Sequence, residues 1–152
     1  MSAEKNLNKF NINLPKAPDP VGAYVASKIV GNLVYISGQL PLSNEGKLIK
    51  GKIGKDLNLE QGQESAKLCA LNLLAQLKKI TGSLDKVKSC IKITGYVNST
   101  DSFIDQPKVI NGASDLIASI FGDAGMHTRA AVSTNSLPLG VSVEVDAIFE
   151  LN

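Results

Sequence analysis

Arg129 is the residue whose type is hardest to explain as ordinary surface charge. The chain has 16 Lys and Arg residues, and Arg129 is its only Arg, so the other 15 are Lys. A guanidinium presents a planar fork of donors that binds a carboxylate through two parallel hydrogen bonds, which a Lys ammonium cannot do. The small residues Ala130 and Ala131 that follow leave space beside the side chain. The pattern indicates a site for a small carboxylate.

Glu144 is the second candidate, as a group that orients a water molecule. It shares the polar face of the last predicted strand with Asp146 and Glu150, so some of these acids serve only as solvated charges. If a hairpin turn near residues 136–137 joins this strand to the one before it, Arg129 and Glu144 lie opposite each other on one face. A plain cross-strand ion pair, which contributes little when exposed, is the competing interpretation.

Three further polar residues are weaker candidates. His127, the only histidine, lies two positions before Arg129 and shares its face of the strand, but a lone histidine there is more often structural, and no second histidine completes a metal site. Ser37 lies in no nucleophile elbow. Asn111 begins a helix, where its amide could reach a ligand or only cap the helix. Each signal is weak alone.

The predicted elements alternate strands with two helices. In chain order they are a hairpin over residues 24–40 around Gly31-Asn32, a short strand over 47–53, a helix from a capping box at Asn58 and Gln61 to Gly82, a strand over 86–98, a helix from Pro107 to Gly122, and two strands over 128–134 and 141–151. Two such helices can cover one face of a mixed sheet, so the predicted class is α+β. Residues 1–20, punctuated by prolines, are predicted as an extended N-terminal lead-in, and residues 21–152 as a single domain.

Composition narrows the class of protein. A chain of 152 residues with 43% hydrophobic content suits one core, and a net charge of +2 is too small to attract nucleic acid. Cys69 and Cys90 occur singly in apolar segments, as buried thiols of a reducing compartment would. The N-terminal segment lacks the apolar core of a signal peptide, and no apolar run is long enough for a membrane. We therefore expect a cytoplasmic protein with no membrane or nucleic-acid partner.

An ordered set of segments resembles the RidA (YjgF-like, reactive intermediate/imine deaminase) family. The set comprises Gly22-Ala23-Tyr24-Val25, the run from Gly31 to Pro41, Thr128 to Val132, Leu137-Pro138 and Val143 to Ile148. The resemblance covers roughly residues 18–151. It is strongest to a longer branch, in which Asn-Gly-Ala-Ser opens the second helix and Gly-x-His-x-Arg leads into the arginine strand, here at residues 111–114 and 125–129.

The resemblance implies a chorismate-mutase-like α+β fold that assembles as a homotrimeric barrel, with sites in clefts between subunits. It also implies roles for individual residues. Arg129 would clamp the substrate carboxylate, Glu144 would help to position the attacking water, and Tyr24, Ser37 and Asn111 would line the pocket. Many members have a cysteine where this chain has Ala131, so that position would contribute at most its backbone N–H.

The expected activity is hydrolytic deamination of 2-imino acids, or of the 2-aminoacrylate-type enamines that tautomerise to them, to 2-keto acids and ammonium. Positioning and electrostatics would suffice, so no metal or organic cofactor is expected. One alternative is a regulator that binds small carboxylates or keto acids at the same clefts without turnover. Another is an endoribonuclease, against which the near-neutral charge argues.

Overall fold

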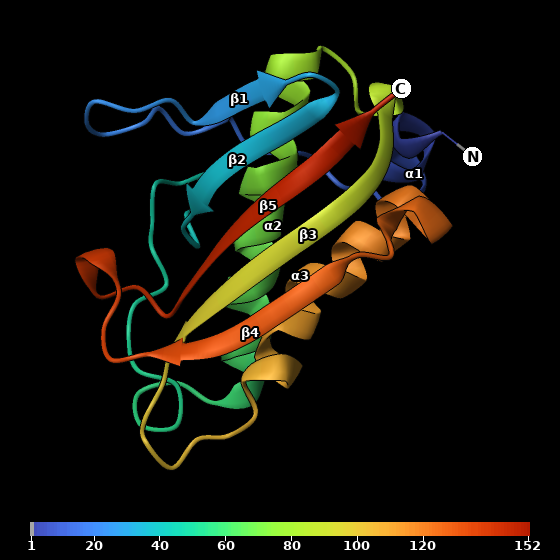
Figure 1. Cartoon of the computed structure of the whole chain (residues 1–152). Coiled ribbons are helices and arrows are strands. Elements are labelled where there is room, and N and C mark those ends of the chain that lie inside the picture. Colours follow the sequence, from blue (N-terminus) through green and yellow to red (C-terminus); the bar gives the residue numbers. More distant parts are fainter. Residues whose placement is uncertain (1) are drawn as a thin grey trace.

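The computed structural model describes residues 2–152, which form a mixed sheet backed by helices (Figure 1). The helices are α1 (Ala3–Lys9), α2 (Leu59–Thr81) and α3 (Gln106–Phe121). The strands are β1 (Ser27–Val30), β2 (Leu33–Gln39), β3 (Val87–Asn98), β4 (Thr128–Thr134) and β5 (Val143–Leu151). Short 3-10 turns lie at Leu84–Lys86, Gly122–Gly125 and Pro138–Gly140.

The sheet order β1-β2-β5-β3-β4 overturns the predicted hairpin between the last two strands. β4 pairs in parallel with β3, and β5 lies between β2 and β3, antiparallel to both. The segment from β3 through α3 to β4 is therefore a crossover unit, which needs a helix-length connection between its parallel strands. The first hairpin, β1 with β2 around Gly31, is confirmed.

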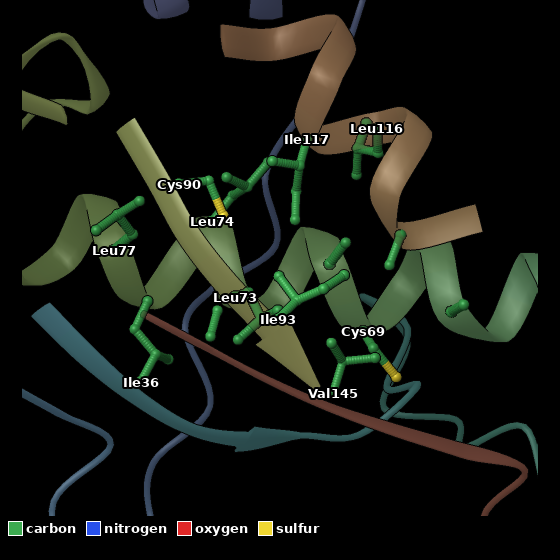
Figure 2. Close-up of a cluster of buried hydrophobic side chains, with 14 of the residues drawn as sticks. Ile36, Cys69, Leu73, Leu74, Leu77, Cys90, Ile93, Leu116, Ile117 and Val145 are labelled. Carbon is green, nitrogen blue, oxygen red and sulfur yellow. The ribbon is translucent and has the colours of Figure 1, made fainter. Parts of the chain in front are cut away.

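α2 and α3 lie on one face of the sheet, behind it in Figure 1. The core fills the space between the two layers, where side chains such as Leu73, Ile93 and Ile117 are fully buried (Figure 2). The predicted α+β class, with two long helices covering one face, is confirmed. Within residues 2–152 no helix covers the opposite face of the sheet (Figure 1), which is called the open face below.

The two long helices begin and end close to where their capping residues predict. Asn58 accepts a hydrogen bond from the backbone N–H of Gln61, whose side chain accepts one from the N–H of Asn58, so the capping box is present. Gly82 ends α2 in the left-handed conformation, with φ of 81°. Pro107 lies in the first turn of α3.

The N-terminal segment departs from the extended lead-in predicted for residues 1–20. Residues 3–9 form α1, whose Leu7 belongs to the core and whose Asn6 Nδ2 donates to the carbonyl of Ile120 at 2.7 Å. Glu4 pairs with Lys78 of α2 at 2.8 Å. A helix of seven residues is marginal alone, so these tertiary contacts stabilise it. Residues 12–26 belong to no helix or strand.

The predicted strand over residues 47–53 is reduced to isolated bridges. Leu48 pairs with Leu42, Lys50 with Val141, and Ile53 with two neighbours. Ile53 is fully buried in the core, so the end of this segment faces the core although the segment forms no continuous strand.

Candidate functional site

Arg129 extends from edge strand β4 toward helix α3. It is in register with Ile93 of β3, a core residue, so its side chain projects from the face of the sheet that the helices cover. There Nη1 donates to Asn111 Oδ1 at 2.8 Å and to Ser114 Oγ at 3.1 Å. The residue as a whole is exposed, so the guanidinium is fixed by the protein on one side and open to solvent on another.

His127 extends this cluster by one more side chain. Its Nε2 lies 2.9 Å from Ser114 Oγ and its Nδ1 lies 2.7 Å from the carbonyl oxygen of Gly125. The residues that meet here, Asn111, Ser114, His127 and Arg129, are called the arginine cluster below. They come from segment 111–114 and from the segment 125–129 that leads into β4. Residues 111–114 were predicted to open the helix but lie inside α3, which already begins at Gln106 beside Pro107.

Local geometry explains why the cluster forms. Asn111 and Ser114 are three positions apart in α3 and so lie on the same helix face. Gly112 turns toward α2, where a Cβ atom would come within 2.1 Å of the Gln63 carbonyl oxygen, so only glycine permits this helix spacing. Gly125 packs as closely against α3, because a Cβ atom there would lie 2.6 Å from the Ile117 carbonyl oxygen.

Glu144 lies on the open face of the sheet, opposite Tyr96 in register. Burial raises the pKa of the Glu144 carboxyl, and the nearby charge of Asp146 raises it further. Burial likewise raises the pKa of Asp146, although the Tyr96 hydroxyl donates to its Oδ2 at 3.2 Å. A carboxyl whose pKa is raised toward neutrality is a better proton acceptor when ionised, so Glu144 has the properties of a group that activates water.

A glycine creates the space for the Glu144 carboxylate. The pairing of β2 with β5 shifts register between Ile36 and Gln39, and Gly38 lies in this irregularity. A Cβ atom on Gly38 would come within 2.6 Å of Glu144 Oε2. The bulge and the missing side chain therefore let Glu144 lie against the β2 backbone.

The carboxylate of Glu144 faces a cleft of about 540 Å³. Its walls are mainly apolar and include Val21, Tyr24, Ala26, Leu40, Leu42, Leu48, Pro138 and Leu139. Val21 is 91% exposed, Leu139 67% and Tyr24 53%, so several large apolar side chains at the cleft face solvent in the single chain. The acids Asp19 and Glu144 also line it. Apolar surface that gathers around acidic groups indicates a binding surface for a ligand or another protein. We call this region the glutamate cleft.

The remaining predicted site residues divide between the two regions. Tyr24 lines the glutamate cleft. Ser37 lies beside it, but its hydroxyl donates to the Val25 carbonyl at 2.8 Å and thereby holds the segment that carries Tyr24. Asn111 belongs to the arginine cluster. Ala131 lies two residues after Arg129 on the same face of β4, packed against the core.

The structure does not bring Arg129 and Glu144 together, as the hairpin prediction required. Arg129 is in register with Ile93 and, through it, with Ala147, three residues beyond Glu144 and two strands away from β4. Ideal strand spacings place the two Cα atoms about 14 Å apart, with side chains on opposite faces. Within one chain the two groups cannot grip one small substrate.

Ser114 was missed as a site residue, and His127 was judged only a neighbour of the site. The available signal was the pair of segments that the family resemblance singled out, residues 111–114 and 125–129, each of which combines a glycine with polar residues. Thirteen positions separate Ser114 from His127, so their contact depends on how α3 packs over β4 and no local periodicity reveals it.

Other chemistry is sparse in the described part of the chain. Cys69 and Cys90 are buried as predicted, and burial raises the pKa of the Cys69 thiol and raises that of Cys90 to about 12, so neither is a ready nucleophile. Among residues 2–152 no three His, Cys, Asp or Glu side chains are grouped to hold a metal ion. No helix in that range has the length and apolar character to cross a membrane.

Comparison with known proteins supplies the family. Residues 4–151 match the family model described as "YjgF/chorismate_mutase-like, putative endoribonuclease". The chain is 44% identical to protein TCP17 of Trypanosoma cruzi over 148 residues, 97% of this chain and 92% of that protein. It is 29% identical over 140 residues to the 2-iminobutanoate/2-iminopropanoate deaminase of Rattus norvegicus, covering 90% of this chain and 86% of the rat protein.

Solved structures agree with that family. A crystal structure from Shewanella oneidensis, described as a "putative endoribonuclease", superposes with a TM-score of 0.95 at 35% identity over 99% of this chain and 100% of the other. The chain belongs to the YjgF/chorismate mutase-like family, which confirms its resemblance to RidA proteins and the chorismate-mutase-like α+β fold that the resemblance implied.

Proposed function

We propose that this protein hydrolyses 2-imino acids and their enamine tautomers to 2-keto acids and ammonium, with Arg129 as the clamp for the substrate carboxylate. The observation that carries the proposal is the held but accessible guanidinium. Its Nη1 is fixed by Asn111 and Ser114, while the residue remains exposed. A fork fixed in this way loses little freedom when a carboxylate binds, so it can give both affinity and orientation.

The proposal includes a homotrimer in which Arg129 of one protomer meets the glutamate cleft of its neighbour. Within one chain the arginine cluster and Glu144 lie on opposite faces of the sheet, so a substrate that uses both needs two subunits. The uncovered face of the sheet and the exposed apolar residues of the glutamate cleft provide surface for such contacts (Figure 1).

The chemistry proceeds by addition of water to a carbon–nitrogen double bond. The carboxylate of Glu144 accepts a proton from a water molecule as the water oxygen bonds to the imine carbon. Protonation of the nitrogen gives a carbinolamine, whose carbon–nitrogen bond then breaks to release ammonia and leave the keto group. The raised pKa of Glu144 suits both the uptake and the return of the proton.

One relative supports an imine substrate. The rat protein named 2-iminobutanoate/2-iminopropanoate deaminase is similar over 90% of this chain. We infer a cytosolic protein, where two buried and unbridged thiols would persist.

Arg129→Lys tests the clamp directly. An amino-acid oxidase generates the imino acid in the assay, catalase removes the peroxide, and a trapping reagent reports the imine that remains. We expect deamination by the variant to fall about a hundredfold, because the charge stays but the fork is lost. Equal thermal stability of variant and wild type is the control for folding.

Three results would contradict the proposal. If Arg129→Lys deaminates as fast as wild type, Arg129 does not act as the carboxylate clamp. Wild type that binds a 2-keto acid without turning over any imino acid would leave a carboxylate-binding regulator instead. RNA cleavage that persists in Arg129→Lys would point to the nuclease suggested by the family description.

A further inference from the structure

The two segments on which the resemblance to a longer branch of the family rests meet in one series of hydrogen bonds. Asn111 and Ser114 come from the first segment, and His127 and Arg129 from the second. The contacts run from Arg129 Nη1 to Ser114 Oγ at 3.1 Å, from Ser114 Oγ to His127 Nε2 at 2.9 Å, and from His127 Nδ1 to the Gly125 carbonyl at 2.7 Å.

When the His127 imidazole is neutral, hydrogen-bonding rules fix the direction of each of these contacts. A carbonyl oxygen only accepts, so His127 Nδ1 must carry a hydrogen and donate it to Gly125. In the neutral imidazole Nε2 is then an acceptor, and the Ser114 hydroxyl donates to it. The lone pairs of Ser114 Oγ are thereby left for Arg129, whose guanidinium can only donate.

The same contacts determine which edge of the guanidinium is available. Nη1 has two hydrogens, and it donates to both Asn111 and Ser114. Within residues 2–152 Nε and Nη2 have no hydrogen-bond partner, and these two nitrogens form one bidentate edge of the fork. A carboxylate that approaches Arg129 therefore finds the Nε–Nη2 edge free and the Nη1 side occupied.

We propose that Ser114 and His127 are positioning residues that hold Arg129 so that it binds the substrate carboxylate through its Nε–Nη2 edge. The inference rests on the proposed function for the identity of the ligand. The hydrogen-bonded relay itself is a property of the protein without ligand. His127 touches neither the substrate carboxylate nor the reacting bond in this arrangement, and acts through Ser114.

The relay can be tested by NMR without any substrate, because His127 is the only histidine in the chain. At about pH 8.5, where an ordinary imidazole is neutral, ¹⁵N shifts distinguish the protonated from the unprotonated ring nitrogen. We expect the Nδ1–H tautomer in the wild type, and a shift of the Nε2 signal in Ser114→Ala as its hydroxyl donor disappears. A predominant Nε2–H tautomer would overturn the relay.

Ligand binding tests the consequence for Arg129. We expect Ser114→Ala to raise the Kd for 2-oxobutanoate, and the KM for the imino acid, about three- to tenfold, as loss of one hydrogen bond predicts, with kcat within about twofold. His127→Leu should show a similar rise. His127→Gln, which keeps an acceptor near Ser114, should recover most of the affinity.

Ser119→Ala is the matched control, because Ser119 lies exposed on the same helix and its hydroxyl only donates to the carbonyl of Leu116. If Ser114→Ala binds 2-oxobutanoate as tightly as Ser119→Ala does, the positioning role is wrong. If the wild type fails to deaminate but shows the expected tautomer and loses keto-acid affinity in Ser114→Ala, the relay stands and only the deaminase proposal falls.

Discussion

The arginine cluster and the glutamate cleft differ in polarity and in how firmly their charged groups are held. The arginine cluster is polar and preorganised, since Asn111 and Ser114 fix Arg129 from within the same chain. The glutamate cleft is mainly apolar and open, and burial raises the pKa of its Glu144 carboxyl. Arg129 does not line the cleft that Glu144 lines, and that cleft has no arginine or lysine in its walls within residues 2–152. The proposed trimer would place these two regions against each other as complementary surfaces of neighbouring subunits.

Mixing two inactive variants gives the largest expected effect. Arg129→Lys removes the guanidinium of the arginine cluster, and Glu144→Gln removes the carboxylate of the glutamate cleft. If each site takes one region from each of two subunits, mixed trimers formed by co-expression regain about one quarter of wild-type activity, since a random quarter of sites combine two intact regions. The assay is the imine-trapping rate, corrected for assembled protein.

The matched control for the mixing experiment is wild type co-expressed with Arg129→Lys, which should retain about half the wild-type rate by the same statistics. A mixture of the two inactive variants that stays at the parental rates would show that the two regions do not share a site.

Gly112→Ala should damage the arginine end through the helix packing beneath it. A Cβ atom at this position would meet the backbone of Gln63 at 2.1 Å, so α3 must move away from α2. We expect the free energy of unfolding to fall by at least about 2 kcal/mol, even after the better helix propensity of alanine. Urea unfolding measures it, with Asp115→Ala on the exposed face of α3 as control. Unchanged stability would contradict the packing role of Gly112.

Gly38→Ala should damage the glutamate end with little effect on folding. The new methyl group would displace the Glu144 carboxylate, which is the movable end of a side chain, so we expect about a tenfold loss of kcat/KM and a change in unfolding free energy below about 1 kcal/mol. The double variant Gly38→Ala/Glu144→Gln is the test, because it should be no slower than Glu144→Gln alone. Additive losses would show that Gly38 acts independently of the carboxylate.

The two ends also differ in how far the sequence predicts them. α2 was predictable because Asn58, Gln61 and Gly82 specify its ends locally. The pairing of β4 was mispredicted because the Leu137-Pro138 turn resembles a hairpin, while the strand-helix-strand order before it already favoured a parallel crossover. Arg129 was predicted from its residue type, from the small residues that follow it and from the family resemblance. Ser114 needed the packing of α3 on β4, and the position of Glu144 needed a bulge at Gly38, neither of which leaves a periodic signal.

Asp146→Asn should produce the smallest effect, and one confined to the glutamate cleft. Burial and then the Asp146 charge raise the pKa of Glu144. Glu144 must be ionised to accept a proton from water, so kcat/KM should fall as the pH drops through that pKa. Removing the neighbouring charge lowers the pKa, and the acidic limb of the profile should move to lower pH, with a gain of about two- to threefold on that limb and little change above it.

The raised carboxyl pKa also makes the free energy of unfolding depend on pH. A carboxyl whose pKa is raised in the folded state contributes stability below its unfolded pKa and loses that contribution as the pH rises through the folded value. Asp146→Asn removes one such penalised charge, while its amide oxygen can still accept from the Tyr96 hydroxyl. The unfolding free energy of the variant should therefore be slightly above that of wild type at neutral pH and equal to it in acid. If the acidic limb stays in place, Glu144 is not the group that sets it, because loss of the Asp146 charge should lower the pKa of Glu144.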